Sequence, residues 1–378
     1  MNTEQAPGWL PHFLIPFFTL SYPTARPAHP DSFPDSNYYA NGPLDGCLII
    51  TAIAVMAILR DVTRIYIMEP FARWKLARDL RLAKQREAVR SNANGNGKAN
   101  GKANVHANGN GHAIGNGHTT HANGNGFVIS RQEAKKMQRS VIRFAEQGWS
   151  VIYYTAQWCF GLYVHLHLPT SVLDPINVWT NYPHIPLAGP IKFYYLLQTA
   201  FYMHQVLIIN AEARRKDHWQ MMTHHIITII LMVGSYFYNY TRVGCLIMVL
   251  MDLCDIFLPL AKMFRYLGMS TVCDATFVLF LSSWFVTRHV LFLLVIKATW
   301  TAWFTVPRVW DPERGQFMTK KTYFGFFTML VALQIIQLIW FWMICRVAYR
   351  VVTGQGAEDT RSDDEGDDGD DDDVRKND

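Results

Sequence analysis

The chain has 378 residues, half of them hydrophobic, yet its mean hydropathy is only +0.03 because apolar and polar stretches are segregated. The apolar windows reach about 20 residues with few charges, the length that crosses a bilayer, and this argues against a soluble domain. The net charge of +5 hides an acidic tail, because the chain from Glu358 onward carries −9 and the rest carries +14. The basic residues flank apolar windows, which favours a topology signal over a nucleic-acid site.

The N-terminal part of the chain predicts one span between two polar regions. Residues 1–43 are rich in Pro and aromatic residues and lack the basic-then-apolar order of a cleavable signal peptide. The first predicted span, 44–68, is followed by the basic stretch 71–90, which the positive-inside rule assigns to the cytosol. The N-terminus is therefore expected in the lumen. Residues 92–126 repeat Asn-Gly with scattered histidines, which predicts a solvated linker rather than a metal-binding tract, within a cytosolic region 69–139.

Six further apolar windows follow the linker. They are 148–168, 190–211, 219–238, 243–263, 275–297 and 322–347. The predicted fold is an all-α membrane protein with about seven transmembrane helices, the last six forming a bundle around a lipid cavity. Alternation of the spans places the acidic tail, 351–378, in the cytosol.

Ionisable residues gather in two consecutive predicted spans. His224 and His225 lie in one span, and Asp252 and Asp255 lie in the next. Each such group costs roughly 2.5–3.5 kcal/mol to insert, so four in one hairpin indicate a functional site in which acids and imidazoles face each other. The two aspartates share a helix face, whereas adjacent histidines point about 100° apart and have different roles. A carboxylate bonded to an imidazole fixes its tautomer and stabilises its charged form.

Two other interpretations of these residues remain open. One is a buried His–Asp network that only fixes helix packing. The other is a di-iron desaturase, which needs several histidine boxes, whereas the only other close pair is His165 and His167. The six cysteines form no CxxC pair and are expected to be small buried hydrophobic residues, so we predict no metal site.

The hairpin also carries three spaced motifs. They are HHxxT at 224–228, SYxxNYxRxG at 235–244, and DxxDxxLxxAKxxxY at 252–266. Together with the segment 192–205, these motifs resemble the longevity-assurance motif of ceramide synthases, inside the TLC (TRAM–LAG–CLN8) domain. The resemblance covers 140–350, the expected catalytic domain of six spans, and is strongest to fungal members. The Asn-Gly linker and the acidic tail lie outside it.

The resemblance implies a reaction and its setting. A ceramide synthase of the endoplasmic reticulum membrane joins the acyl group of acyl-CoA to the amine of a sphingoid base, giving ceramide and CoA. Acyl-CoA is a substrate, so no cofactor is expected. A histidine acts either as a general base for direct attack by the amine or as a nucleophile that forms an acyl-imidazole, and the resemblance favours His224 in the second role. Resemblance to fungal members also implies a homodimer and a small single-span regulatory subunit.

Further residues are predicted to bind the substrates. Basic residues at the cytosolic helix ends are candidates for the CoA phosphates: Arg214, Arg215, Lys216, Lys262 and Arg265. Arg288, inside the sixth span, needs a buried partner, for which Asp252 or Asp255 is the candidate. The motifs add Thr228, Ser235, Asn239, Arg242 and Tyr266. By resemblance, the loop 298–321 influences acyl-chain length.

Other functions remain open from the sequence. They are a non-enzymatic TLC-domain lipid sensor or insertion helper, a lipid transporter, and an acyltransferase for another amine or alcohol. Release of CoA from acyl-CoA in the presence of sphinganine separates an enzyme from the first two. Assays with a panel of amine and alcohol acceptors test the last of these, an acyltransferase for another acceptor.

Overall fold

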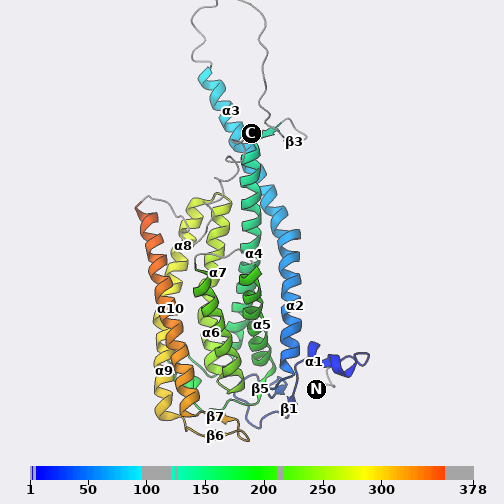
Figure 1. The fold of residues 1–378 in the computed structure, drawn as a ribbon, viewed down its shortest axis with the longest axis vertical. Coiled ribbons are helices and arrows are strands. Elements are labelled where there is room, and N and C mark those ends of the chain that lie inside the picture. Colours follow the sequence, from blue (N-terminus) through cyan, green and yellow to red (C-terminus); the bar gives the residue numbers. More distant parts are fainter. Residues whose placement is uncertain (1, 3–5, 96–120, 124–126, 212–216, 354–378) are drawn as a thin grey trace, which may run out of the picture. The chain divides into compact units, whose positions relative to one another are not determined.

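The computed structural model describes residues 2, 6–95, 121–123, 127–211 and 217–353. These residues divide into two compact units. The first unit comprises Met1–Leu59, Ile152–Leu258 and Thr276–Asp378, and the second comprises Arg60–Val151 and Pro259–Ala275. Helices dominate both units, and the predicted all-α class is confirmed (Figure 1).

Long helices follow one another along the chain. They are α2 (Asp45–Val62), a π-helical turn (Thr63–Met68), α3 (Glu69–Gly95), α4 (Arg131–Leu166), α5 (Gly189–Ala211), α6 (His218–Phe237), α7 (Thr241–Tyr266), α8 (Ser270–Trp284), a second π-helical turn (Phe285–Leu291), α9 (Phe292–Thr305) and α10 (Lys320–Val352). Within the first unit, α5 packs on α6, α6 on α10, and α10 on α9, so these helices run side by side (Figure 1). Short elements join them: η1 (His12–Leu14), α1 (Ile15–Phe18) and a 3-10 turn (Pro175–Val178).

Several of these helices are suited to a bilayer. Four are long and apolar enough to cross it: Asp45–Arg90, Thr241–Tyr266, Ser270–Thr305 and Lys320–Arg350. Helices also occupy the predicted spans at 148–168, 190–211 and 219–238, within α4, α5 and α6. Helix α5 is less hydropathic because it carries Lys192, Gln198 and His204, all buried inside the protein. A multi-pass membrane protein is therefore confirmed, and the count of seven spans stays a prediction.

Short antiparallel strands connect the helices. β1 (Pro23–Thr24), β2 (Tyr38–Tyr39) and β5 (Leu187–Ala188) form one sheet, with Pro23 opposite Tyr39 and Tyr38 opposite Ala188. β6 (Trp310–Asp311) pairs with β7 (Gln316–Phe317), and β3 (His121–Asn123) with β4 (Phe127–Ile129). The first sheet therefore attaches the N-terminal segment to the residues that lead into α5.

A buried ion pair strengthens this attachment. The Lys192 ammonium, which is 0% exposed, has three donors and contacts three oxygens, each at 2.7 Å: Asp45 Oδ1, the Ser21 carbonyl and the Ala40 carbonyl. Asp45 Oδ2 accepts from the Tyr236 hydroxyl at 2.7 Å. Because the ammonium pairs with a carboxylate and bonds to two carbonyls, its charge is compensated inside the fold.

Two residues position α7 against its neighbours: Asn239 at the turn from α6, and Gly244 at the contact with Tyr195 of α5. Asn239 ends α6 in the left-handed conformation, with φ of +62°, which asparagine tolerates better than most residues. Its side chain donates to the Gly315 carbonyl at 2.8 Å and accepts from the Asn41 amide at 3.0 Å. At Gly244 on α7, a Cβ would lie 1.7 Å from the Tyr195 hydroxyl, so only glycine allows this close approach.

The second unit contains a helix start with a reciprocal cap. Ser130 Oγ accepts from the Glu133 backbone N–H at 3.2 Å, while the Glu133 carboxylate accepts from the Ser130 N–H at 2.9 Å. Lys84 of α3 donates to the same carboxylate at 2.9 Å. The bond from Lys84, with those from Ser130, lowers the pKa of Glu133 to about 2. This capping box therefore also joins α3 to the start of α4.

Candidate active site

A cavity lies within the first unit, between α5, α6, α7, α9 and α10. Its space of about 860 Å³ includes openings to the surroundings, and its lining is mostly apolar. His224, Thr228 and Ser235 line it from three different turns of α6, and Arg288 and Gln337 line it from other helices. Ser235 lies three turns beyond His224, about 16 Å at 1.5 Å per residue. The cavity is therefore elongated along α6, with an imidazole at one end.

The two histidines point in different directions, as their spacing predicts. Their rings lie at 88° to each other. His224 lines the cavity and contacts the Trp340 ring of α10 at 5.1 Å between centroids. His225 is buried, packs on Tyr202 of α5 at 5.8 Å, and its Nδ1 bonds to the Met221 carbonyl at 2.8 Å. Of the pair, only His224 presents its ring to the cavity.

The two aspartates bind other side chains. Asp252, which is 1% exposed, accepts a short hydrogen bond from the Gln198 amide of α5. Asp255 forms an ion pair with Arg288. Within the described residues neither aspartate bonds to an imidazole, which corrects the expected direct carboxylate–imidazole contact. Each carboxylate instead satisfies a stronger or better-placed donor on a neighbouring helix.

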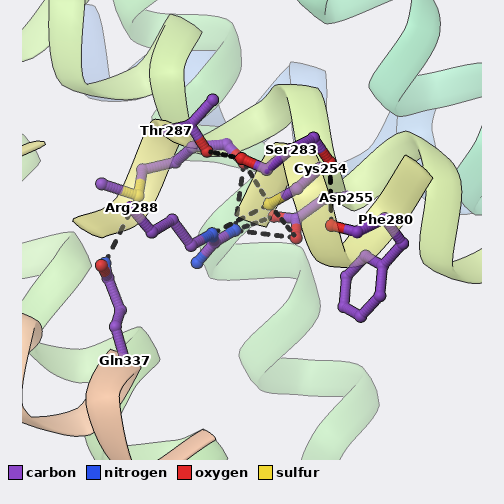
Figure 2. A network of polar contacts seen from close by, with 8 residues as sticks. Cys254, Asp255, Phe280, Ser283, Thr287, Arg288 and Gln337 are labelled. Atoms are coloured by element: carbon purple, nitrogen blue, oxygen red, sulfur yellow. Dashed lines mark hydrogen bonds and ion pairs between the residues drawn. The ribbon is translucent and has the colours of Figure 1, made fainter. Parts of the chain in front are cut away.

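Arg288 is the centre of a buried polar network (Figure 2). Its Nη2 donates to both oxygens of Asp255 at 2.8 Å and to the Met251 carbonyl at 3.0 Å, and its Nε lies 2.9 Å from Cys254 Sγ. The guanidinium also lies 4.2 Å from the Trp284 ring centroid, within cation–π range. The prediction that Arg288 requires an aspartate partner is confirmed.

The π-helical turn explains why Arg288 and His289 both point inward. Adjacent residues of an α-helix diverge by about 100°, and π-helical turns change this spacing locally, often at functional sites. Arg288 is 3% exposed and His289 8%. His289 bonds to Gln334 of α10 at 2.9 Å, while Arg288 faces α7. The turn therefore allows one short segment to contact two helices.

Two predicted substrate contacts have other roles in this geometry. Asn239 holds the α6–α7 turn, as described above. Arg242 pairs with Asp31 of the N-terminal segment and lines a second, polar pocket of about 540 Å³ together with His184. Burial, with the nearby Arg242 charge, lowers the pKa of His184 to about 4. Neither Asn239 nor Arg242 is among the residues that line the main cavity, and their contact with substrate stays a prediction.

The remaining predicted binding residues fall into three groups. Thr228, Ser235 and Arg288 line the cavity. Tyr266 belongs to the second unit, where it packs on an apolar cluster around Phe144, and Lys262 and Arg265 lie in that unit too. Arg214, Arg215 and Lys216 lie outside the described residues. The predicted contact with CoA phosphates stays a prediction.

Three polar residues of the site were missing from the sequence-based prediction. Gln198 bonds to Asp252, and Gln337 and Tyr202 line the cavity. The signal for the glutamines is an uncharged amide inside an apolar window, which hydropathy averaging hides. Within the described ranges, no group of three or more His, Cys, Asp or Glu side chains is arranged to hold a metal ion.

Removing Arg288 is expected to destabilise the first unit. Arg288→Met leaves the Asp255 carboxylate without its main partner, at a cost of about 3 kcal/mol for a partly buried pair. The midpoint of thermal unfolding of the detergent-purified protein should fall by about 5–10 °C. The double variant Arg288→Met/Asp255→Leu should recover much of this loss. An equally low midpoint in the single and double variants would contradict the pairing.

These features define a class: an all-α, multi-pass membrane protein with a largely apolar cavity between its helices and a histidine in the cavity wall. Residues 143–346 match the family described as the TLC domain. The chain belongs to this family, and the family predicted from its motifs is confirmed.

Curated relatives extend the comparison. The chain is 38% identical over 260 residues to "Ceramide Synthase FUM18" of Gibberella moniliformis, covering 61% of this chain and 60% of that protein. It is 39% identical over 243 residues to "Sphingosine N-acyltransferase lag1" of Schizosaccharomyces pombe, with the same coverage of 61% and 60%. "Ceramide synthase LOH2" of Arabidopsis thaliana is 35% identical over 232 residues, 60% of this chain and 76% of that protein. The match thus spans about 60% of the length of the fungal relatives.

Proposed function

We propose that this protein is a ceramide synthase, which transfers the acyl group of acyl-CoA to the amine of a sphingoid base. The observation that carries this proposal is His224, whose imidazole forms part of the wall of an elongated apolar cavity. The names of the relatives, which include ceramide synthases and sphingosine N-acyltransferases, support the same reaction. A lipid sensor or transporter has no need of an imidazole at the end of an acyl-sized cavity.

The reaction needs a base near neutral pH. The amine of the acceptor must lose a proton before its nitrogen attacks the thioester carbonyl, and an imidazole suits that step. That first proton leaves to solvent. As the N–C bond forms and the C–S bond breaks, the nitrogen loses a second proton, which His224 takes and returns to the CoA thiolate. In the two-step alternative, His224 first displaces the thiolate and the amine then displaces His224. His225 is held by the Met221 carbonyl and supports its neighbour without facing the cavity.

The catalytic assignments for the other residues follow from their contacts. Asp255 holds Arg288 at the cavity wall, and Asp252 holds Gln198 between α5 and α7. Both carboxylates are therefore positioning groups for the site in this proposal. The guanidinium of Arg288 lies where it can stabilise negative charge on the thioester oxygen as the amine attacks.

The setting of the enzyme is part of the proposal. Basic stretches beside the spans support an endoplasmic reticulum membrane protein with its N-terminus in the lumen and its C-terminus in the cytosol. The basic residues near helix ends are proposed to bind the CoA phosphates. No cofactor is required, because acyl-CoA supplies the activated acyl group. A homodimer and a small single-span regulatory subunit are proposed from the resemblance to fungal members.

One assay tests the function directly. Purified protein is incubated with acyl-CoA and sphinganine, and both CoA thiol release and ceramide are measured. We expect equal amounts of the two products. Lipid movement between vesicles without CoA release would favour a transporter, and product only with another amine or an alcohol would favour a different acyltransferase.

A second measurement separates the two chemical routes. Protein incubated with acyl-CoA alone is digested and analysed by mass spectrometry. An acyl adduct on the peptide that contains His224 selects the two-step route. An active protein with no adduct selects direct attack by the amine.

The far end of the cavity is expected to limit acyl length. Met318 is 2% exposed and lines the cavity near Tyr240. Met318→Ala lengthens the space, and Val243→Phe shortens it. Each change should shift the ratio of kcat/KM for longer and shorter acyl-CoAs by about 10-fold, in opposite directions. Unchanged ratios in both variants would show that the acyl chain lies elsewhere.

A further inference from the structure

Gln337 is a buried amide in the cavity wall that the reaction described above does not use. It lies on α10 and is 1% exposed. Its Nε2 donates to Met251 Sδ at 3.3 Å (Figure 2). Within the described part of the chain, its Oε1 has no hydrogen-bond partner. A buried carbonyl oxygen without a donor is unfavourable, and the same is true of Gln334 Oε1. Gln337, unlike Gln334, lines the cavity, so its unpaired oxygen is placed to bond with a ligand.

Gln337 is connected to His224, the reacting imidazole, through a neighbouring residue on α10. Trp340 follows it by three residues on α10, on the same helix face, and the Trp340 ring contacts the His224 ring. Met251, which accepts from the Gln337 amide, also accepts from Arg288 through its carbonyl. The three cavity residues His224, Arg288 and Gln337 are therefore linked through Trp340 and Met251.

The chemistry of the unpaired atom identifies which substrate it meets. An amide oxygen accepts hydrogen bonds, so its partner must carry an N–H or O–H group. The acyl chain and the thioester group carry neither. A sphingoid base carries an amine and neighbouring hydroxyl groups, and its amine must approach His224 to react.

We propose that Gln337 is a specificity-determining residue that holds the polar head of the acceptor, by accepting a hydrogen bond from its amine or from a hydroxyl next to it. The inference rests on the proposed function for the identity of the acceptor. Thr228, one turn from His224 on α6, also has an unpaired, buried hydroxyl oxygen in the cavity lining, so the head has polar contacts on two sides. An amine without hydroxyl groups has no O–H to satisfy the second atom, so the two atoms together favour a hydroxylated base.

The test replaces the amide by a side chain of the same length. Gln337→Met keeps the volume and removes the oxygen. Gln334→Met, one turn earlier on α10, makes the same chemical change at a glutamine that bonds to His289 and is not part of the cavity lining. Gln337→Glu keeps an oxygen at the same place. If Gln337→Met does not accumulate as folded protein, Gln337→Asn, which draws the amide back by one methylene, replaces it.

Initial rates of ceramide formation give separate KM values for sphinganine and acyl-CoA. We expect Gln337→Met to raise the KM for sphinganine by about 10- to 100-fold, with the KM for acyl-CoA unchanged, as for loss of one buried hydrogen bond. Gln337→Glu should restore most of the affinity, and Gln334→Met should resemble the wild type. An unchanged KM for sphinganine in Gln337→Met, or an equal rise for both substrates, would overturn the proposal.

Binding without turnover separates this inference from the proposed function. Sphinganine should raise the unfolding midpoint of the wild type and of Gln334→Met, and this rise should be lost in Gln337→Met. A wild type that makes no ceramide defeats the proposed function, and the sphinganine-dependent rise then still decides the role of Gln337. An equal rise in all three proteins would defeat the role of Gln337 alone.

Discussion

Replacing His224 with alanine is expected to lower the rate of ceramide formation by about 10³-fold, the range for loss of a base or nucleophile. Its ring is the only imidazole of the pair that faces the cavity, so His225 has no route to the reacting carbonyl. The measurement is kcat for CoA release with saturating acyl-CoA and sphinganine. The unfolding midpoint should stay near that of the wild type, because the side chain lies at a cavity wall.

A buried histidine elsewhere provides the matched control. His289 lies in the same unit, bonds to Gln334, and is not part of the cavity lining. His289→Gln should keep most of the activity. A His224→Ala protein with near-normal turnover would refute the catalytic assignment, and so would equal losses in His224→Ala and His289→Gln.

The largest effect on stability is expected at Lys192. Lys192→Met leaves the Asp45 carboxylate buried without its cation, at a cost of about 3–5 kcal/mol. The unfolding midpoint of the detergent-purified protein should fall by about 10 °C or more. The N-terminal segment should also become sensitive to protease, because the Ser21 and Ala40 carbonyls lose the donor that holds them.

Loss of a positive charge by itself is not expected to lower the unfolding midpoint. Lys297 is an exposed lysine on α9, and Lys297→Met makes the same chemical change without a buried partner, so its midpoint should be unchanged. The double variant Lys192→Met/Asp45→Asn should recover part of the loss, because the uncompensated charge is removed. If Lys192→Met unfolds at the wild-type temperature, the ion pair does not hold the N-terminal segment.

The sequence predicted the site to the level of helices and residue types. Segregated hydropathy predicted the spans, and four ionisable residues in one hairpin predicted a functional site there. Arg288, inside the sixth predicted span, predicted a carboxylate partner, which its ion pair with Asp255 supplies. These inferences succeed because the cost of burying charge is local and large. The choice of Asp255 over Asp252 was open, since both lie on one face of α7 and only the neighbouring helices distinguish them.

The contacts that the sequence did not predict join residues that are far apart in the chain. Asn239 and Arg242 belong to the same motif as the histidines, yet they bond to Asn41 and Asp31 of the N-terminal segment. Motif membership does not separate a residue that contacts substrate from one that holds a loop. Gln198 and Gln337 were not predicted, because a single uncharged amide changes the mean hydropathy of an apolar window only slightly. Its role depends on its bonding partners, which lie far away in the sequence.

The π-helical turn between α8 and α9 has a consequence for how this family tolerates length changes. A π turn accommodates one more residue than an α turn, so deleting one residue there would leave a continuous helix with intact backbone bonding. The residues on either side of the turn would keep their orientation relative to each other, because the π turn absorbs the extra residue. Within the turn itself, adjacent residues would return to α-helical spacing and diverge by about 100°, so Arg288 and His289 could no longer both point inward. The extra residue of this segment is therefore needed for its two contacts to form together.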